Sequence, residues 1–442
     1  MHINKVNQIC LIILTSILFA GVGPGNTNSP FSAILILIFI FIEFFQTGNF
    51  KLKFEKIFII PLCLLFLVYT IGPLLDIKII NSTYYLDRLI MCFVFLIYGT
   101  YLNQISLKYL ISASIKSCLI IFPFYILESI LIIANKDLLI NLRSFLGLRS
   151  IYLNNLVNPI LGNHEPSHMV ITILLILFSV LVLKNYFKIE NNLSFIKNLI
   201  LNILFILCLF YFSGTYYSTI AISLLVIFFT LIIRFLKTKK LLKINFLKIR
   251  NLIFIFALTL SFLLSGIGYL STKVEISRTG DISTIKRSYQ LFRAVSDFKM
   301  TYGLGTGAAT YEIKTKESNE QILKNFKFLD QYEYITSGLL DIEYKQNKKI
   351  PFYSIVGKIT SEIGFLGFSL ISLPFLYTIY LYFKEIIFNK YISFELIQTY
   401  FFTIACYLIM IAGGLRGSII QWLILIISFK LLHYKKKLLL KY

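Results

Sequence analysis

The chain has 442 residues, of which 57% are hydrophobic and 14% are charged, and its formal net charge is +22. A soluble domain carries roughly 25% charged residues, so this composition excludes a water-facing globular fold. The apolar residues form blocks of about 17–25 residues, the length that spans a bilayer. No basic stretch occurs in a soluble fold, so the positive charge indicates membrane topology and not nucleic-acid binding.

These blocks predict an all-α polytopic membrane protein with about twelve transmembrane helices. The first begins after Lys5 and resembles a signal peptide, but we expect it to be an uncleaved span. The predicted spans are residues 8–23, 31–46, 57–75, 86–102, 110–134, 166–187, 196–213, 215–235, 250–270, 356–383, 394–412 and 416–433.

The connections between these spans alternate in charge. Every second connection is rich in Lys and Arg, and the intervening ones are poor in them apart from two longer loops. Lys and Arg concentrate on the cytoplasmic side, whereas long loops escape this rule. We therefore expect both termini in the cytoplasm and the long loops outside. The connections expected outside include Gly21–Pro30, Gly72–Tyr84, Gly413–Gly417 and the two longer loops, Asn135–Glu165 and Ser271–Tyr353.

These features predict one integral membrane domain in three parts. Residues 1–270 hold nine spans, residues 271–355 form a large extracytoplasmic loop, and residues 356–442 hold the last three spans. The loop is expected to open with a helix capped by Asp281 or Ser283. The Gly303–Gly307 segment is expected to be a backbone turn, because no strand precedes these glycines as a dinucleotide fingerprint requires.

Glu165 lies where the outer loop enters a span, between His164 and His168 and directly before Pro166. One interpretation is a helix start, because Pro and a carboxylate both suit the first turn. The other is catalytic: a carboxylate in a partly apolar site is suited to take a proton from a hydroxyl, with His168 assisting. The two histidines do not predict a zinc site, because Pro166 separates them and no third ligand is evident.

A second candidate site is cationic. Arginine binds phosphate oxygens in a bidentate fork, so a set of arginines at the outer membrane surface could hold a diphosphate. The alternative for the arginines of the long loop is a solvated loop face. The alternative for Arg416 is that its side chain snorkels to the membrane interface. The set consists of Arg278, Arg287, Arg293 and Arg416.

Glu362 is a third candidate, in the segment Ser361–Gly367 at the start of the tenth predicted span. Ionisable groups at membrane depth are functional candidates, so Glu362 is expected to be either catalytic or structurally bonded to another span. Gly364 and Gly367 permit close helix packing. Asp87 and Arg88, at another span entry, are expected to pair with each other or to anchor the interface.

No cofactor or metal is expected. The six cysteines lie inside apolar blocks and form no CxxC pair, which is typical of small buried hydrophobes. The sequence also contains no HExxH, Walker A or GxSxG motif.

The chain resembles the O-antigen polymerases (Wzy type), within the wider group that includes the O-antigen ligases. The resemblance in topology covers nearly the whole chain, and four short motifs carry it. They are Glu165-Pro166-Ser167, the loop from Arg278 through Ser283-Thr284 to Arg287, Gly303–Gly307, and Ser361-Glu362-Ile363-Gly364-Phe365-Leu366-Gly367.

The resemblance implies a GT-C-like membrane glycosyltransferase in the bacterial inner membrane. Its substrate would be a polyprenyl-diphosphate-linked oligosaccharide repeat, here undecaprenyl-linked, and a chain-length regulator and a flippase would be its partners. The ligases use a histidine in the large outer loop, but the histidines here are at positions 2, 164, 168 and 433. A flippase would show two related halves, which this chain lacks. A purely structural membrane protein is a third alternative.

Overall fold

The computed structural model describes residues 4–18, 30–48, 55–145, 222–237, 293–311, 355–389, 394–412 and 419–439. Within these ranges the regular structure is helical and contains no strand. Residues 222–237 and 293–300 are helical, and a 3₁₀ turn, η2, covers Gly72–Leu75. The labelled helices are α1 Lys5–Leu18, α2 Pro30–Thr47, α3 Lys56–Ile71, α4 Ile77–Ile80, α5 Thr83–Gln104, α6 Leu107–Ala134, α7 Lys136–Phe145, α14 Ile355–Phe388, α15 Phe394–Ala412 and α16 Ile419–Leu439.

Wherever a predicted span falls within the described ranges, its described residues are helical, although the spans 8–23, 215–235 and 416–433 are described only in part. In the part of the chain that the structure describes, three helical segments are long and apolar enough to cross a membrane, namely Lys56–Leu74, Tyr84–Gln104 and Ile355–Phe388. The predicted spans 166–187, 196–213 and 250–270 lie outside the described residues. The short helices α4 and α7 were not predicted. They lie in segments that were expected to be connections between spans.

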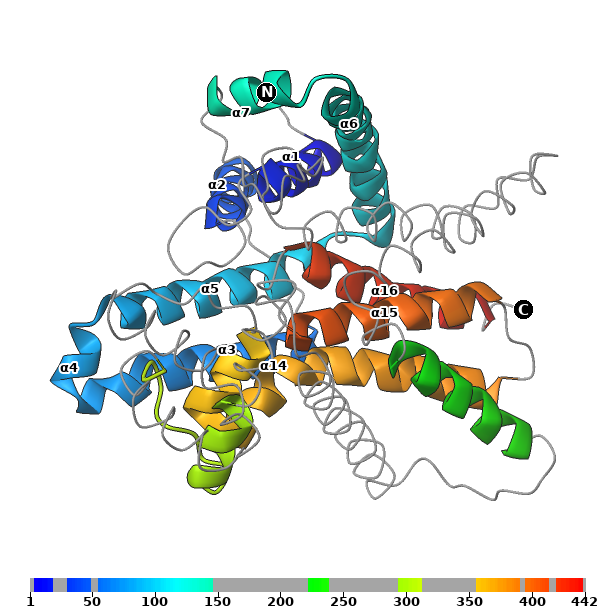
Figure 1. Cartoon of the computed structure of the whole chain (residues 1–442). Coiled ribbons are helices and arrows are strands. Elements are labelled where there is room, and N and C mark those ends of the chain that lie inside the picture. The colour runs from blue at the N-terminus through cyan, green and yellow to red at the C-terminus, as the bar shows by residue number, and fades with distance from the viewer. Residues whose placement is uncertain are drawn as a thin grey trace, which may run out of the picture.

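Helices α3, α5 and α14 lie side by side, and α15 and α16 pack against them (Figure 1). Trp422 of α16 is fully buried between these helices, with its ring centroid 5.8 Å from that of Phe95 and 5.6 Å from that of Phe375. Helix α1 packs mainly against α6 and α2 (Figure 1). An apolar core of this kind orders the helices but leaves the few buried charges to be matched separately.

Polar contacts group the helix ends. The start of α1 meets the end of α2 through Lys5 Nζ and Glu43 Oε1, 2.8 Å apart. The end of α5 joins them, because the Tyr101 hydroxyl donates to Gln8 Oε1 at 3.2 Å. Lys430 of α16 donates to the Asn103 carbonyl oxygen at 2.7 Å at the same end of α5. We call this the Lys5 end of the bundle. The opposite end, where α3 ends and α5 and α14 begin, is the Glu362 end.

Helix α14 is interrupted at Gly364, whose φ of 64° and ψ of −143° are not helical. A break of this kind leaves backbone groups without their partners in the helix. The turn Gly303–Gly307 supplies replacements. Phe365 N donates to the Gly303 carbonyl oxygen at 2.8 Å, and Gly307 N donates to the Glu362 carbonyl oxygen at 2.8 Å. The segment 293–311, yellow-green in Figure 1, is thereby fixed to the start of α14.

The glycines of both segments are required by this contact. Gly303, Gly305 and Gly307 all have positive φ, which confirms the predicted turn. A Cβ atom on Gly305 would lie 2.5 Å from the Glu362 carbonyl oxygen, and one on Gly364 would overlap the Gly303 carbonyl oxygen. The close approach expected at Gly364 is therefore made to a loop and not to a second helix.

We predict that Gly305→Ala destabilises the protein far more than Gly48→Ala. Both glycines have positive φ, but a Cβ on Gly48 meets nothing within 4 Å. Gly48→Ala should cost about 1 kcal/mol from backbone strain alone, whereas overpacking against α14 should bring the cost of Gly305→Ala to roughly 3 kcal/mol. The apparent melting temperatures of the detergent-purified variants measure this difference. Equal losses would contradict the close docking of the turn.

Candidate functional site

Glu362 lies two residues before the break in α14, and its buried carboxylate accepts hydrogen bonds from three other parts of the chain. Arg88 Nε lies 3.1 Å from both carboxylate oxygens, and Arg88 Nη2 lies 3.1 Å from Oε1. The Tyr69 hydroxyl donates to Oε2 at 2.7 Å. The backbone N–H of Tyr311 donates to Oε1 at 3.1 Å. One carboxylate thus joins α3, α5, α14 and the segment 293–311. We call Glu362 and its partners Arg88, Tyr69 and Tyr311 the Glu362 cluster.

Arg88 is as deeply buried as Glu362, and it contacts two carboxylates. Its Nη1 donates to Asp87 Oδ2 at 3.0 Å, while Nε and Nη2 face Glu362. The planar guanidinium can serve both partners at once because its donors point along fixed directions. Inside a low-dielectric interior such an ion pair is costly to bury but far more costly to break on one side.

A second buried cluster lies beside the first. Arg293 Nε is 3.6 Å from Asp297 Oδ2, and the Arg293 guanidinium carbon lies 3.6 Å from the centre of the Tyr311 ring. Arg293 Nη2 also donates to the Tyr311 carbonyl oxygen, and the Ser361 hydroxyl donates to Asp297 Oδ2. The Tyr311 peptide groups therefore connect the two clusters, because its N–H faces Glu362 and its carbonyl faces Arg293.

Of the predicted site residues, the structure describes Glu362 and Arg293, and their contacts have different consequences for the two predicted roles. Both oxygens of Glu362 already accept hydrogen bonds, which favours the structural one of the two roles left open by the sequence. Arg293 is buried among Asp297 and Tyr311, so a diphosphate would reach it only after those contacts rearranged. Catalysis by Glu362 and diphosphate binding by Arg293 stay predictions. The remaining members, Glu165, His168, Arg278, Arg287 and Arg416, lie outside the described residues.

Sequence reasoning found only part of the Glu362 cluster. The expected pairing of Asp87 with Arg88 is confirmed, but the main partner of Arg88 was missed. The available signal was that Arg88 and Glu362 carry opposite charges near the ends of apolar helices, where an unmatched charge is costly. Nothing in the sequence singled out Tyr69 or Tyr311.

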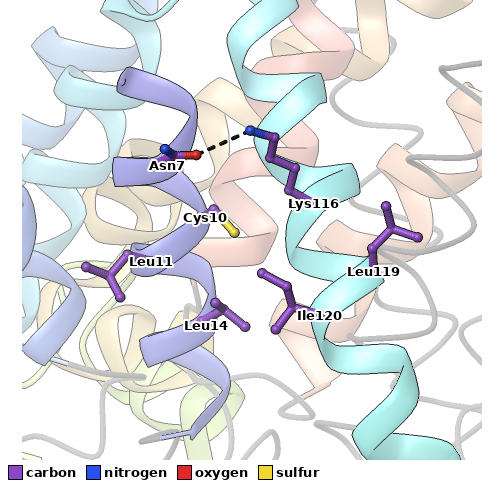
Figure 2. A pocket seen from close by; sticks show the side chains of 7 residues that line it. All are labelled: Asn7, Cys10, Leu11, Leu14, Lys116, Leu119 and Ile120. Atoms are coloured by element: carbon purple, nitrogen blue, oxygen red, sulfur yellow. Dashed lines mark hydrogen bonds between the residues drawn. The ribbon is translucent and has the colours of Figure 1, made fainter. Parts of the chain in front are cut away.

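Between α1 and α6, at the Lys5 end, lies an open groove of about 470 Å³ (Figure 2). Its one polar corner is formed by Lys116 Nζ, which donates to Asn7 Oδ1 at 3.3 Å. Below this corner the groove is apolar, and none of the described residues that line it carries a carboxylate. Its lining residues are Asn7, Cys10, Leu11, Leu14, Lys116, Leu119 and Ile120.

Among the described residues, no group of three or more His, Cys, Asp or Glu side chains is placed to hold a metal ion. Comparison of the chain with protein-family models, with curated proteins and with solved structures gives no match. The functional interpretation therefore depends on the motifs of the sequence and on the geometry of the Glu362 end.

We predict strong energetic coupling between Arg88 and Glu362. Arg88→Met leaves a buried carboxylate without its counter-charge and should cost about 3–5 kcal/mol of stability. Adding Glu362→Gln removes that charge. The double variant should therefore lose much less stability than the sum of the losses in the two single variants. Thermal unfolding of the two single variants and the double variant completes the cycle.

The pair Lys5–Glu43 is the matched control, because its side chains are 45% and 36% exposed. A Lys5→Met and Glu43→Gln cycle should give a coupling below about 1 kcal/mol, as exposed ion pairs do. If the Arg88 and Glu362 losses were simply additive, the cluster would not be held together by the ion pair.

Proposed function

We propose that this chain is a membrane-embedded polymerase of polyprenyl-diphosphate-linked oligosaccharide repeats, of the O-antigen polymerase type. Its action would take place at the outer face of the bacterial inner membrane. The observation that carries the proposal is the meeting of two motifs on which the resemblance rests. Gly303–Gly307 and Ser361–Gly367 are distant in sequence, yet Thr306 N donates to the Ser361 carbonyl oxygen at 2.9 Å beside the other two backbone bonds.

The proposed topology has about twelve spans with both termini in the cytoplasm. The grouping of helix ends supports it. Tyr69, Arg88 and Glu362 each lie next to a connection expected outside, and they meet at one end. Lys5 lies next to the terminus, and Glu43 next to a connection, that are expected in the cytoplasm, and these two residues meet at the other end. Arg234, near the end of the 222–237 helix, donates through Nη1 to the Asn389 carbonyl oxygen at 2.6 Å. Both residues lie next to connections that are expected in the cytoplasm.

The proposed reaction is a glycosyl transfer. A sugar hydroxyl of the acceptor repeat attacks the anomeric carbon of the donor glycan, forming the new glycosidic bond. The bond from that carbon to the diphosphate oxygen breaks, and the polyprenyl diphosphate leaves with the electron pair. Glu165 takes the hydroxyl proton, helped by His168. Arg278, Arg287 and Arg416 hold the charge that develops on the leaving group, with Arg293 as a further member if its present contacts open.

In this proposal the Glu362 cluster is positional. Glu362 and Arg88 attach the segment 293–311 to three helices, and that segment continues the loop that carries Arg278 and Arg287. The attachment holds this segment at the Glu362 end, which in the proposed topology faces the outer membrane surface, where the diphosphate of a lipid-linked substrate would lie. Catalysis by preorganised charge requires such fixation, because a displacement of about 1 Å can cost on the order of a hundredfold in rate.

We predict that Glu165→Gln abolishes polymerisation. The amide keeps the size of the side chain but cannot accept the hydroxyl proton, so the rate should fall by about a factor of 10² to 10⁴. The host strain is deleted for the gene and complemented with each variant, and its surface polysaccharide is run on a gel. Wild type restores a ladder, whereas Glu165→Gln should leave core carrying a single repeat.

Glu43→Gln is the matched control, because Glu43 is a partly exposed carboxylate at the opposite end of the bundle. It should restore the ladder fully. An intact ladder with Glu165→Gln would eliminate the general-base role. In the deletion strain itself, loss of all glycan from the lipid core would indicate a ligase or flippase, and accumulated carrier-linked long chains would identify the ligase.

We predict that the arginine set acts through its geometry and not only through its charge. Arg287→Gln should lower the polymerisation rate by about 10²-fold, and Arg287→Lys should restore only part of it, because lysine cannot form the bidentate fork. Lys299→Gln is the control, an exposed cation in the segment 293–311. Transfer rates with purified protein and lipid-linked repeats measure the effect. Equal losses in Lys299→Gln and Arg287→Gln would reduce the set to a general electrostatic field.

A further inference from the structure

The tip of the turn Tyr302–Leu304 presents large apolar side chains away from the protein. Tyr302 is 96% exposed and Leu304 is 80% exposed, although both belong to a turn that is bonded firmly to α14. Tyr302 also has a φ of 53°, in the left-handed region that bulky residues rarely adopt. Backbone strain of this kind persists where the surrounding structure imposes it, and it often marks a functional position.

The level of this turn along α14 can be fixed from the sequence of the helix. Phe365–Phe383 is an uncharged stretch of 19 residues, preceded closely by Glu362 and followed by Lys384. At 1.5 Å per residue this stretch is about 28 Å long, which matches a hydrocarbon core of about 30 Å. Phe365 therefore lies at one boundary of the core. Gly303, bonded to Phe365 N through its carbonyl oxygen, lies at the same boundary.

A second attachment prevents the turn from lifting away from this level. Ala308 packs against the end of α3, where a Cβ atom on Gly72 would lie 3.0 Å from the Ala308 Cβ. Gly72 falls within Lys56–Leu74, another of the helical segments that can cross a membrane. The turn is thus held between the ends of two such helices.

We propose that the Tyr302–Leu304 turn is an interfacial anchor that inserts into the bilayer at the Glu362 end. Its partner is membrane lipid, because the turn continues the apolar surface of α14 formed by Phe365, 47% exposed, and Leu366, 50% exposed. A tyrosine suits this layer, since its ring can lie among the acyl chains while its hydroxyl reaches the headgroups. Leu304, two residues further along the same turn, adds a purely apolar side chain.

This anchor depends only on the bundle spanning a bilayer and not on the proposed polymerase activity. It assigns the turn a task that the Glu362 cluster does not perform. The cluster fixes the loop segment laterally to α3, α5 and α14, whereas the anchor fixes its height relative to the lipid headgroups.

The experiment uses Tyr302→Trp in the full-length protein, reconstituted into nanodiscs of phosphatidylcholine brominated at shallow or deep acyl positions. Trp422 is the single native tryptophan, so the wild-type signal can be subtracted. Leu373→Trp is the depth control, because it lies near the centre of the uncharged stretch and is 40% exposed. Aqueous iodide is the opposing quencher. Leu304→Trp provides a second reporter should Tyr302→Trp fail to fold.

Tryptophan at position 302 should be quenched about twofold more by shallow than by deep bromines, with little quenching by iodide, and position 373 should show the reverse depth preference. Strong iodide quenching without bromine quenching would place the turn in water and overturn the proposal. Protection from both quenchers would show that protein covers the turn, which would overturn it equally.

Discussion

A carboxylate and a guanidinium buried together among apolar helices must find their hydrogen-bonding partners inside the protein, because lipid supplies none. Glu362 meets this constraint with donors from Arg88, Tyr69 and Tyr311. Each donor belongs to a different part of the chain, so satisfying one carboxylate fixes the ends of α3 and α5 and the segment 293–311 relative to α14. The apolar core alone would not fix them so closely, because apolar contacts have little directionality.

The same constraint extends to the backbone. The break at Gly364 exposes peptide groups near the membrane boundary, where irregular backbone is tolerated only if protein satisfies it. The turn Gly303–Gly307 satisfies these groups, and it can approach closely because Gly305 and Gly364 carry no Cβ. The carboxylate and the glycines of the Ser361–Gly367 motif are therefore parts of one device. The glycines bring the loop to the helix, and Glu362 then holds the loop through Tyr311.

The sequence was sufficient for features that depend on local composition. Apolar length predicted α3, α5 and α14, adjacent charges predicted the Asp87–Arg88 pair, and closely spaced glycines predicted the turn at 303–307. It was insufficient where partners are distant, because Arg88 and Glu362 lie 274 residues apart and no local pattern joins them. Helix α7 was missed for a different reason: it is short and mixed in polarity, so neither apolar length nor a cap before a long apolar run marked it.

The hydrogen bonds that Glu362 accepts also bear on which residue could act as the general base. A general base needs a lone pair that faces its substrate, and both oxygens of Glu362 face donors within the protein. If the chain transfers glycans, the proton acceptor is better sought at Glu165, which the sequence places at a different span entry. Glu362 would then act on the reaction only through the loop that it holds. Because that loop leads to Arg278 and Arg287, its position at the membrane surface would decide whether those guanidinium groups reach a lipid-linked diphosphate at all.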